Sequence, residues 1–502
     1  MGGAAKDPNV QEPEGFVEKF TILGKAPREL WLIYFAKICE TAAYALVNAG
    51  LMLHLINDLG YSDQGAGGFV GVWATVISLF TFLVGSLSDA IGIRKTLIFS
   101  FALCVVTRVA VALIGDPLLT PIFGLMPMTL GVAMTIPVMV AGARRFTSPR
   151  QRSIGFSLLY VVMNVGFLIA GWLYDYVRNA MGEDGTFGLL GLELTVYQTI
   201  FFISAGFTLA GLLPVMLAMR RGVEMFDDGV RVDPATEGEV STEGGPLQVF
   251  WASMVKTGKI LSEVFGEKAF YRFLLLVGLV VGVRMVFYHM HYTLPVWADR
   301  EMGYGARFGR AWGVINPALI VVLTPIVGAL AQKVASFRMI IIGTTISSIT
   351  VFLLVLPADT FVGLSGGALE SVLKVFLRVD GDLSPLYFNL CLFAALFSIG
   401  EAIWSPRLYE YTASVAPKGR EATYMSLSLL PMFLAKLTVG PVAGVLLDAY
   451  CPAEGAREST MLWLVIAVMA VFSPVSILLF KGVITKQRTP DPGDEDGAEV
   501  TA

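Results

Sequence analysis

The 502-residue sequence is poor in charge. Only 15% of its residues are Asp, Glu, Lys or Arg, whereas 55% are hydrophobic, and an average soluble domain carries about 25% charged residues. A chain with so few polar side chains cannot cover a water-soluble globule, so part of its surface must face lipid. The formal net charge of −4 also gives no basic field, which excludes nucleic acid as an expected partner.

Cysteine, histidine and enzyme motifs are scarce as well. The four cysteines are far apart and three of them lie inside apolar runs, so they predict neither a disulfide framework nor a metal site. The sequence contains no Walker loop, no zinc-ligand spacing and no nucleophile elbow in context. We therefore expect no cofactor, no metal and no enzymatic activity. Without a nucleotide-binding domain, an ATP-driven pump is not expected either.

Long apolar runs dominate the rest of the sequence. A bilayer core of about 30 Å is crossed by about 20 apolar residues in a helix. Twelve segments meet this requirement: 31–56, 66–88, 95–115, 119–146, 152–177, 195–219, 269–296, 308–332, 337–357, 386–413, 422–449 and 459–481. The polar N-terminus lacks the pattern of a signal peptide, so we expect the first run to remain a membrane helix. The sequence thus predicts an all-α membrane protein with twelve transmembrane helices.

The polar stretches between these runs predict the domain organisation. We expect a cytoplasmic tail over 1–28 and a six-helix bundle over 29–221. A cytoplasmic linker with an amphipathic helix follows over 222–266, and a second six-helix bundle over 267–483. The last segment, 484–502, is expected to be an acidic disordered tail. Another short amphipathic helix, "GALESVLKVFLR", is expected in the gap 358–385. Lys and Arg gather in the loops of one side, which predicts that both termini are cytoplasmic, and an inner-membrane location if the source is bacterial.

Two stretches recur in the same order, once in each half. "GSLSDAIGIRK" is echoed by "GALAQKVASFR", and "SPRQRSIGFSLLYVV" is echoed by "APKGREATYMSLSLL". The helix after the second stretch ends near Asp175 in the first half and near Asp448 in the second. These echoes indicate a duplicated six-helix unit, which places a substrate site between the halves near the bilayer midplane.

The loop after the second predicted helix resembles a known motif. "GSLSDAIGIRK" is similar to the G-x-L-a-D-r-x-G-r-k loop of the major facilitator superfamily, with matches that include Gly85, Asp89, Gly92 and Arg94. The resemblance implies a facilitator fold in which this loop tethers helix 2 to helix 11 and biases the outward-open state. The alternative is an ordinary solvated, positively charged cytoplasmic loop.

Three more stretches resemble the proton-coupled oligopeptide transporters, known as the POT family. Tyr160 and Asn164 match its G-F-s-x-x-Y-x-x-x-N-x-G helix, Glu401 matches its G-E-l-x-x-S-P helix, and Glu40 and Tyr44 match part of its E-x-x-E-R-F-x-Y-Y-G helix. The resemblance implies peptide and proton symport, with Glu401 meeting the amino group of the substrate.

The sequence departs from that family at three functional positions. Lys37, Thr41 and Ile136 stand where the family carries a Glu, an Arg and a Lys. In the family, the replaced residues bind the peptide carboxylate and relay protons. We therefore interpret the chain as a divergent relative with a different substrate.

Ionisable residues inside the apolar runs are the main functional candidates, because charge at membrane depth costs several kcal/mol unless it is paired or hydrated. They are Lys37, Glu40, Arg108, Arg284, Glu401 and Lys436.

Their partners can be proposed from spacing and helix order. Lys37 and Glu40 are three residues apart and are expected to pair, either as a structural bridge or as a pair that breaks on protonation. Arg284 is expected to meet Glu40 across the halves. Lys436 either neutralises Glu401 or binds a substrate anion, and Arg108 is placed on a flanking helix. His289 and His291 lie near a helix end, where they are solvated or carry protons.

Four cations against two carboxylates predict a cavity with surplus positive charge. We expect the protein to transport a small organic solute together with protons by alternating access. The solute is zwitterionic or anionic and can be peptide-like. Membrane lipid is the other expected partner, and the sequence does not predict the oligomeric state. A drug or metabolite exporter of the same fold is an alternative, although "GFLIAGW" lacks the Gly-Pro pair of exporters. A second alternative is a non-transporting scaffold or assembly factor with the same fold, although such a protein would gain nothing from six buried charges.

Overall fold

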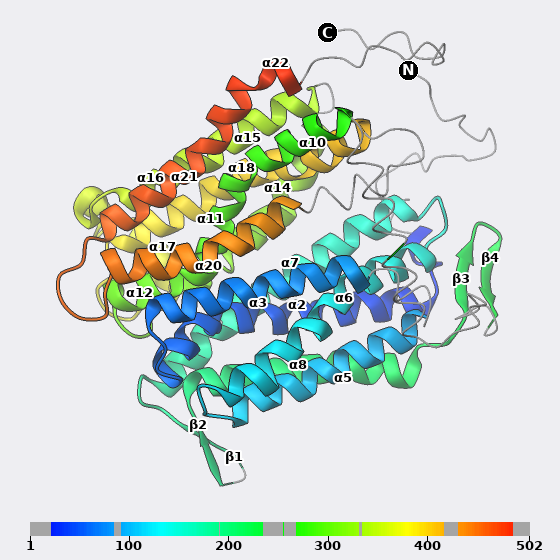
Figure 1. Cartoon of the computed structure of the whole chain (residues 1–502), viewed down its shortest axis with the longest axis horizontal. Coiled ribbons are helices and arrows are strands. Elements are labelled where there is room, and N and C mark those ends of the chain that lie inside the picture. Colours follow the sequence, from blue (N-terminus) through cyan, green and yellow to red (C-terminus); the bar gives the residue numbers. More distant parts are fainter. Residues whose placement is uncertain are drawn as a thin grey trace.

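A computed structural model describes residues 22–84, 92–189, 191–233, 255, 268–330, 334–415 and 430–484. Twelve helical segments of this part of the chain are long and apolar enough to cross a membrane. They form two groups that follow one another in sequence and lie side by side. The axes of their helices are roughly aligned (Figure 1). The predicted twelve-helix, two-bundle architecture is therefore confirmed.

The first bundle contains six spans, and π-helical turns extend two of them. Its helices are α2 (Arg28–Leu53) with η1 (His54–Asp58), α3 (Asp63–Val84), α5 (Ile93–Leu113), η2 (Thr120–Leu125) with α6 (Met126–Arg145), α7 (Arg152–Met181) and α8 (Val196–Ala218). Two antiparallel hairpins, which the sequence did not predict, accompany it: β1 (Phe187–Leu189) with β2 (Leu192–Leu194), and β3 (Val223–Phe226) with β4 (Gly229–Val232).

The second bundle is built from more broken helices. They are α10 (Lys268–Leu279), α11 (Val281–Tyr292), α12 (Leu294–Met302), α13 (Phe308–Ala311), α14 (Ile315–Leu330), α15 (Ser336–Thr350), α16 (Phe352–Val355), η4 (Ala358–Leu364), α17 (Ala368–Leu377), α18 (Leu386–Val415), α20 (Leu430–Tyr450), α21 (Ser459–Leu479) and α22 (Lys481–Ile484). The seventh predicted span is interrupted at 280 and 293. The eighth and ninth are interrupted once each, at 312–314 and 351. The short amphipathic helix expected in the gap 358–385 is α17.

Two predicted features lie mostly outside the described residues. The amphipathic linker helix falls almost entirely in 234–267, and the facilitator-type loop falls in 85–91, which includes Gly85 and Asp89. The end of that loop is described. Gly92 has φ 91° and precedes α5, a left-handed backbone conformation that glycine adopts without steric cost.

Local chemistry accounts for the start of α8. The hydroxyl of Thr195 accepts a hydrogen bond from the Gln198 N–H (3.2 Å), and the Gln198 side chain accepts one from the Thr195 N–H (3.0 Å). This reciprocal capping box satisfies two N–H groups that a helix end would otherwise leave without partners. It fixes the point at which the chain re-enters the membrane after the β1–β2 hairpin.

The bundles meet at two crossings that are lined with glycine. At the first, α3 packs on α20, and a Cβ added to Gly67 would lie 2.8 Å from the Gly444 backbone. At the second, α7 packs on α13 and α14, and a Cβ added to Gly171 would lie 2.8 Å from the Gly313 carbonyl carbon. Both distances are far below van der Waals contact, so only glycine allows the backbones this close.

Candidate substrate and proton-coupling site

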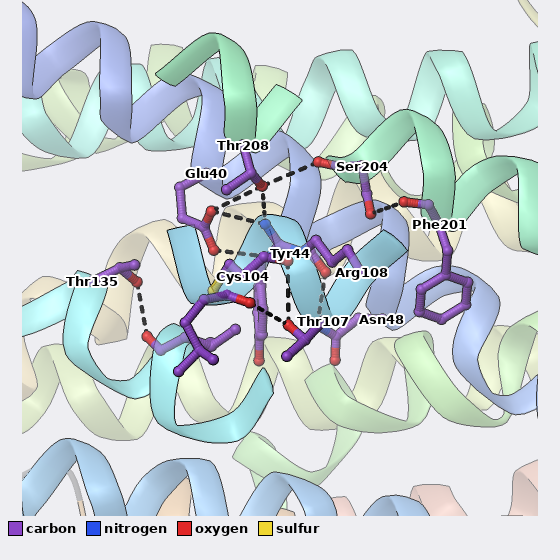
Figure 2. A network of polar contacts seen from close by, with 12 residues as sticks. Glu40, Tyr44, Asn48, Cys104, Thr107, Arg108, Thr135, Phe201, Ser204 and Thr208 are labelled. Carbon is purple, nitrogen blue, oxygen red and sulfur yellow. Dashed lines mark hydrogen bonds and ion pairs between the residues drawn. The ribbon is translucent and has the colours of Figure 1, made fainter. Parts of the chain in front are cut away.

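Glu40 and Arg108 form a buried ion pair inside the first bundle. Glu40 lies on α2 and Arg108 on α5, with relative exposures of 4% and 0%. Two guanidinium nitrogens donate to the two carboxylate oxygens at 2.8 and 2.9 Å, and Arg108 also contacts the hydroxyl of Thr208 on α8 (Figure 2). Three helices are thereby joined through one two-pronged interaction, a geometry that favours Arg over Lys.

This pair corrects two sequence expectations. The carboxylate of Glu40 does not meet Arg284 across the halves, because Arg108 occupies both of its oxygens. The expected Lys37–Glu40 ion pair is absent among the ion pairs of the described residues for the same reason. Arg108, on the helix that the sequence predicted to flank the bundle, is the partner of Glu40 instead.

Arg284 on α11 lies against α18 in the second bundle. Its guanidinium carbon is 4.5 Å from the centre of the Trp404 ring, and one nitrogen is 3.3 Å from the Ser405 hydroxyl. The side chain is buried, with 6% exposure. A cation over an indole face is attracted by the ring, but no carboxylate forms an ion pair with Arg284 among the described residues. Its charge is therefore available to an anionic ligand.

Glu401 on α18 is buried beside Arg284. Its carboxylate accepts a hydrogen bond of 3.0 Å from the side-chain amide of Asn316 on α14, which also donates to Ser398. Arg284 is close enough to attract the carboxylate electrostatically. Glu401 thus has one neutral hydrogen-bond donor and one nearby cation.

Lys436 on α20 faces aromatic side chains rather than Glu401. Its ammonium lies 5.6 Å from the centre of the Tyr288 ring, and Tyr44 of α2 and His291 of α11 are also electrostatic neighbours. The expectation that Lys436 neutralises Glu401 is therefore wrong for this conformation. The second expectation, that it binds a substrate anion, stays a prediction.

The two bundles also touch at this depth. The Tyr292 hydroxyl of α11 donates to the Asn48 side chain of α2 at 3.4 Å, and Tyr44 lies one turn away from Asn48 on the same helix. Lys37, two turns before Tyr44, is half-buried on α2. Lys37 and Tyr44 therefore belong to the first bundle, and Arg284, Glu401 and Lys436 belong to the second.

The remaining predicted residues are more scattered. Asn164 on α7 is buried and donates to the Tyr160 carbonyl (2.9 Å), while the Tyr160 side chain is 38% exposed. Arg94 donates to the Met216 carbonyl (2.7 Å) and so ties α5 to α8. His289 is fully buried and bonds to Thr293 at 2.7 Å, so the expectation that it is solvated is wrong.

Polar contacts close one end of the interface between the bundles, which we call the clamped end. Arg300 donates to both oxygens of Asp63 at 2.7 Å, and Gln64 donates to Asp448 at 2.7 Å. Arg178 forms an ion pair with Asp299. Each contact joins one bundle to the other, so separating the bundles at this end would break all three.

A second set of contacts at the clamped end centres on Asp175. Its carboxylate accepts hydrogen bonds from the N–H groups of Gly309 (3.0 Å) and Arg310 (2.7 Å), at the start of α13. Tyr304 donates to the carbonyl of Gly182 at 2.8 Å, and burial raises the pKa of its phenol, which therefore remains a donor. Asp175 in the first half and Asp448 in the second thus hold equivalent crossings. The repeat had singled out both residues, and their clamp role is what the sequence reasoning missed.

Comparison with known proteins identifies the family. Residues 33–377 match the sequence profile of the Major Facilitator Superfamily. The chain belongs to the major facilitator superfamily. With twelve apolar spans in its described residues, it is an integral, multi-pass membrane protein of this superfamily.

Curated relatives of this facilitator include peptide transporters. The chain is 23% identical over 204 residues to dipeptide and tripeptide permease B of Salmonella typhimurium, and 27% identical over 195 residues to peptide transporter family 1 of Drosophila melanogaster. These matches include 39% and 36% of this chain. They span 40% and 26% of the length of the relatives.

Solved structures of POT family transporters share the whole fold of this facilitator. One, in complex with 5-aminolevulinic acid, has a TM-score of 0.66 at 16% identity and covers 92% of this chain and 97% of its own. Another, from work on substrate recognition in proton dependent oligopeptide transporters, has a TM-score of 0.63 at 17% identity and covers 92% of this chain and 100% of its own. The predicted resemblance to this family is therefore confirmed at the level of fold.

Proposed function

We propose that this facilitator is a proton-coupled symporter of a small organic solute that carries a carboxylate, either zwitterionic or anionic and including short peptides. The observation that carries the proposal is the set of ionisable groups inside the two helix bundles. Once Glu40 and Arg108 neutralise each other, Lys37, Arg284 and Lys436 remain against Glu401. A surplus of buried positive charge favours a ligand that brings a negative one.

Glu401 is the proposed proton carrier. When it is charged, it interacts with Arg284 and leaves that cation less available to the substrate. When it takes a proton, Arg284 is left without a counter-ion, and a substrate carboxylate can replace it. Proton binding and substrate binding would then favour each other, which is what symport requires.

The clamped end is the proposed non-cytoplasmic end. The opposite end carries the positively charged turns around Arg94, Arg145, Arg152 and Arg220, and loops rich in Lys and Arg stay in the cytoplasm. The described conformation would then be one whose outer side is closed. The relatives named as dipeptide and tripeptide transporters support short peptides as the first solutes to test.

Uptake into liposomes tests the recognition step. Proteoliposomes with an acidic exterior would be screened with di- and tripeptides, amino acids and the C-terminally amidated form of each hit. We expect uptake of the free carboxylates only, and an increase of about tenfold or more in KM for Arg284→Gln, since a charge-assisted contact contributes at least about 1.4 kcal/mol. The exposed Arg231→Gln is the matched control. Equal uptake of a solute and its amide would contradict the proposal.

A further inference from the structure

Three arginines converge where α7 crosses the second bundle at the clamped end. Arg310 on α13 donates to the Leu377 carbonyl at 2.8 Å, and Arg307 donates to the Arg378 carbonyl at 3.1 Å. These bonds attach the C-terminal end of α17 to α13. They bring Arg307 and Arg378 close enough to Arg310 for the charge of each to repel the Arg310 guanidinium.

The carboxylate that attracts Arg310 is already engaged elsewhere. It belongs to Asp175, and both of its oxygens accept hydrogen bonds from backbone N–H groups. Arg310 is 2% exposed, and its buried Nε has no hydrogen-bond partner. Among the described residues, no oxygen accepts a hydrogen bond from the Arg378 guanidinium. The cluster therefore has unused donors that point to an anionic ligand.

An exposed aromatic pair borders the same cluster. Trp172 and Tyr176 on α7 stack with their ring centres 5.6 Å apart, and they are 41% and 50% exposed. The guanidinium carbons of Arg310 and Arg378 lie 5.7 and 5.9 Å from the Trp172 ring centre. Exposed Trp and Tyr near the end of a membrane span are typical of the lipid headgroup level. The open side of the arginine cluster is therefore at the depth of lipid phosphates.

The backbone of Arg378 gives an independent indication. It follows α17 with φ 54° and ψ 56°, and it is the one non-glycine residue with positive φ among the described residues. Glycine is the usual residue in this helix-ending conformation, because a side chain makes it sterically costly. An arginine held there against its conformational preference is consistent with a binding role for its side chain.

We propose that Arg307, Arg310 and Arg378 bind the phosphate of an anionic lipid, in the leaflet at the clamped end, with Trp172 beside the headgroup. The arginines belong to the second bundle and Trp172 to the first, so a bound lipid bridges the crossing of α7 with α13. It stabilises the conformation in which the clamped end is closed. A free phosphate ion would make the same contact with the guanidinium groups as a lipid phosphate does. The exposed aromatic pair beside the cluster favours a lipid.

Thermal unfolding of the purified full-length protein in detergent tests this site. We expect added phosphatidylglycerol to raise the Tm, while phosphatidylcholine and inorganic phosphate at the same concentration leave it unchanged. In Arg378→Gln, the phosphatidylglycerol concentration needed for half of the shift should rise roughly fivefold. The control Arg231→Gln, an exposed arginine on the β3–β4 hairpin, should respond as the wild type does.

A second variant separates lipid binding from folding. Arg378→Gly suits the left-handed backbone, so its Tm without lipid should equal or exceed that of the wild type, yet its response to phosphatidylglycerol should be reduced. An unchanged response in Arg378→Gly, or an equal response to phosphatidylcholine, would overturn the proposal. A shift produced by inorganic phosphate alone would also overturn it, because the site would then bind the free ion.

Discussion

Glu40 and Arg108 are buried together, and each leaves an uncompensated charge if the other is removed. Burying two charges is costly, and the mutual attraction offsets that cost only while both partners and their hydrogen bonds are present. The Thr208 hydroxyl extends the network to a third helix (Figure 2). We therefore assign this pair to the stability of the first bundle, and leave proton coupling to Glu401.

Single substitutions of the pair should destabilise the protein more than removal of both charges. We expect Arg108→Gln or Glu40→Gln to cost about 3–5 kcal/mol, and the double variant to cost less than either single one. Thermal unfolding in detergent measures this, with the exposed Glu183→Gln as control. Additive losses in the double variant would contradict the assignment.

The glycine-lined crossing of α3 and α20 is the clearest feature at the scale of elements. Gly67 faces the α20 backbone, whereas a Cβ on its neighbour Gly68 would meet no atom within 4 Å. Both are helical glycines, so alanine improves helix propensity equally at the two positions. Comparing the Gly67→Ala and Gly68→Ala variants therefore separates the effect of crowding at the crossing from the effect of helix propensity.

Cys451 offers a native reporter of this crossing. The thiol lies just after α20 and is buried, and burial raises its pKa, so little of the reactive thiolate is present at neutral pH. We expect Gly67→Ala to open the clamped end and to speed labelling of Cys451 by a membrane-impermeant maleimide, with Gly68→Ala unchanged. Equal labelling rates in the two variants would show that the crossing does not control opening.

The elements also show what sequence could predict. The twelve spans follow from the length of apolar runs, a local property. Where the structure describes them, most of their ends agree with the helices to within a few residues, as for 459–481 against α21. No proline lies at the breaks at 280 and 351, and the helix segments on both sides of each break pack against α21. The β1–β2 hairpin was missed because its strands of three residues carry almost no periodic signal.

At the scale of the whole molecule, the two bundles are joined by polar clamps at one end and by Tyr292 and Asn48 at mid-depth. Spacing along one helix named the candidate charges but did not predict their partners, because the partners depend on how the helices are rotated in the bundle. Lys37 and Glu40 share a helix, yet Arg108 from another helix takes the carboxylate.

The Asp63–Arg300 pair should hold the clamped end shut. A contribution of about 1.4 kcal/mol would change the ratio of closed to open molecules about tenfold, so we expect Arg300→Gln to raise the Cys451 labelling rate by roughly that factor. Because the thiolate is the reacting species, labelling should also quicken as pH rises. The charge-swapped variant D63R/R300D should restore slow labelling. If it labels as fast as the single variant, the pair does not close this end.

Proton flux that depends on both substrate and Glu401 is the most direct test of the proposed function. In proteoliposomes that enclose a pH-sensitive dye, addition of a transported solute should acidify the interior of wild-type vesicles. Glu401→Gln should abolish this acidification and gradient-driven accumulation, while exchange of labelled for unlabelled solute continues. The exposed Glu183→Gln should behave as the wild type does. Solute accumulation without acidification in the wild type, or full proton flux in Glu401→Gln, would contradict the proposal that Glu401 couples protons to the solute.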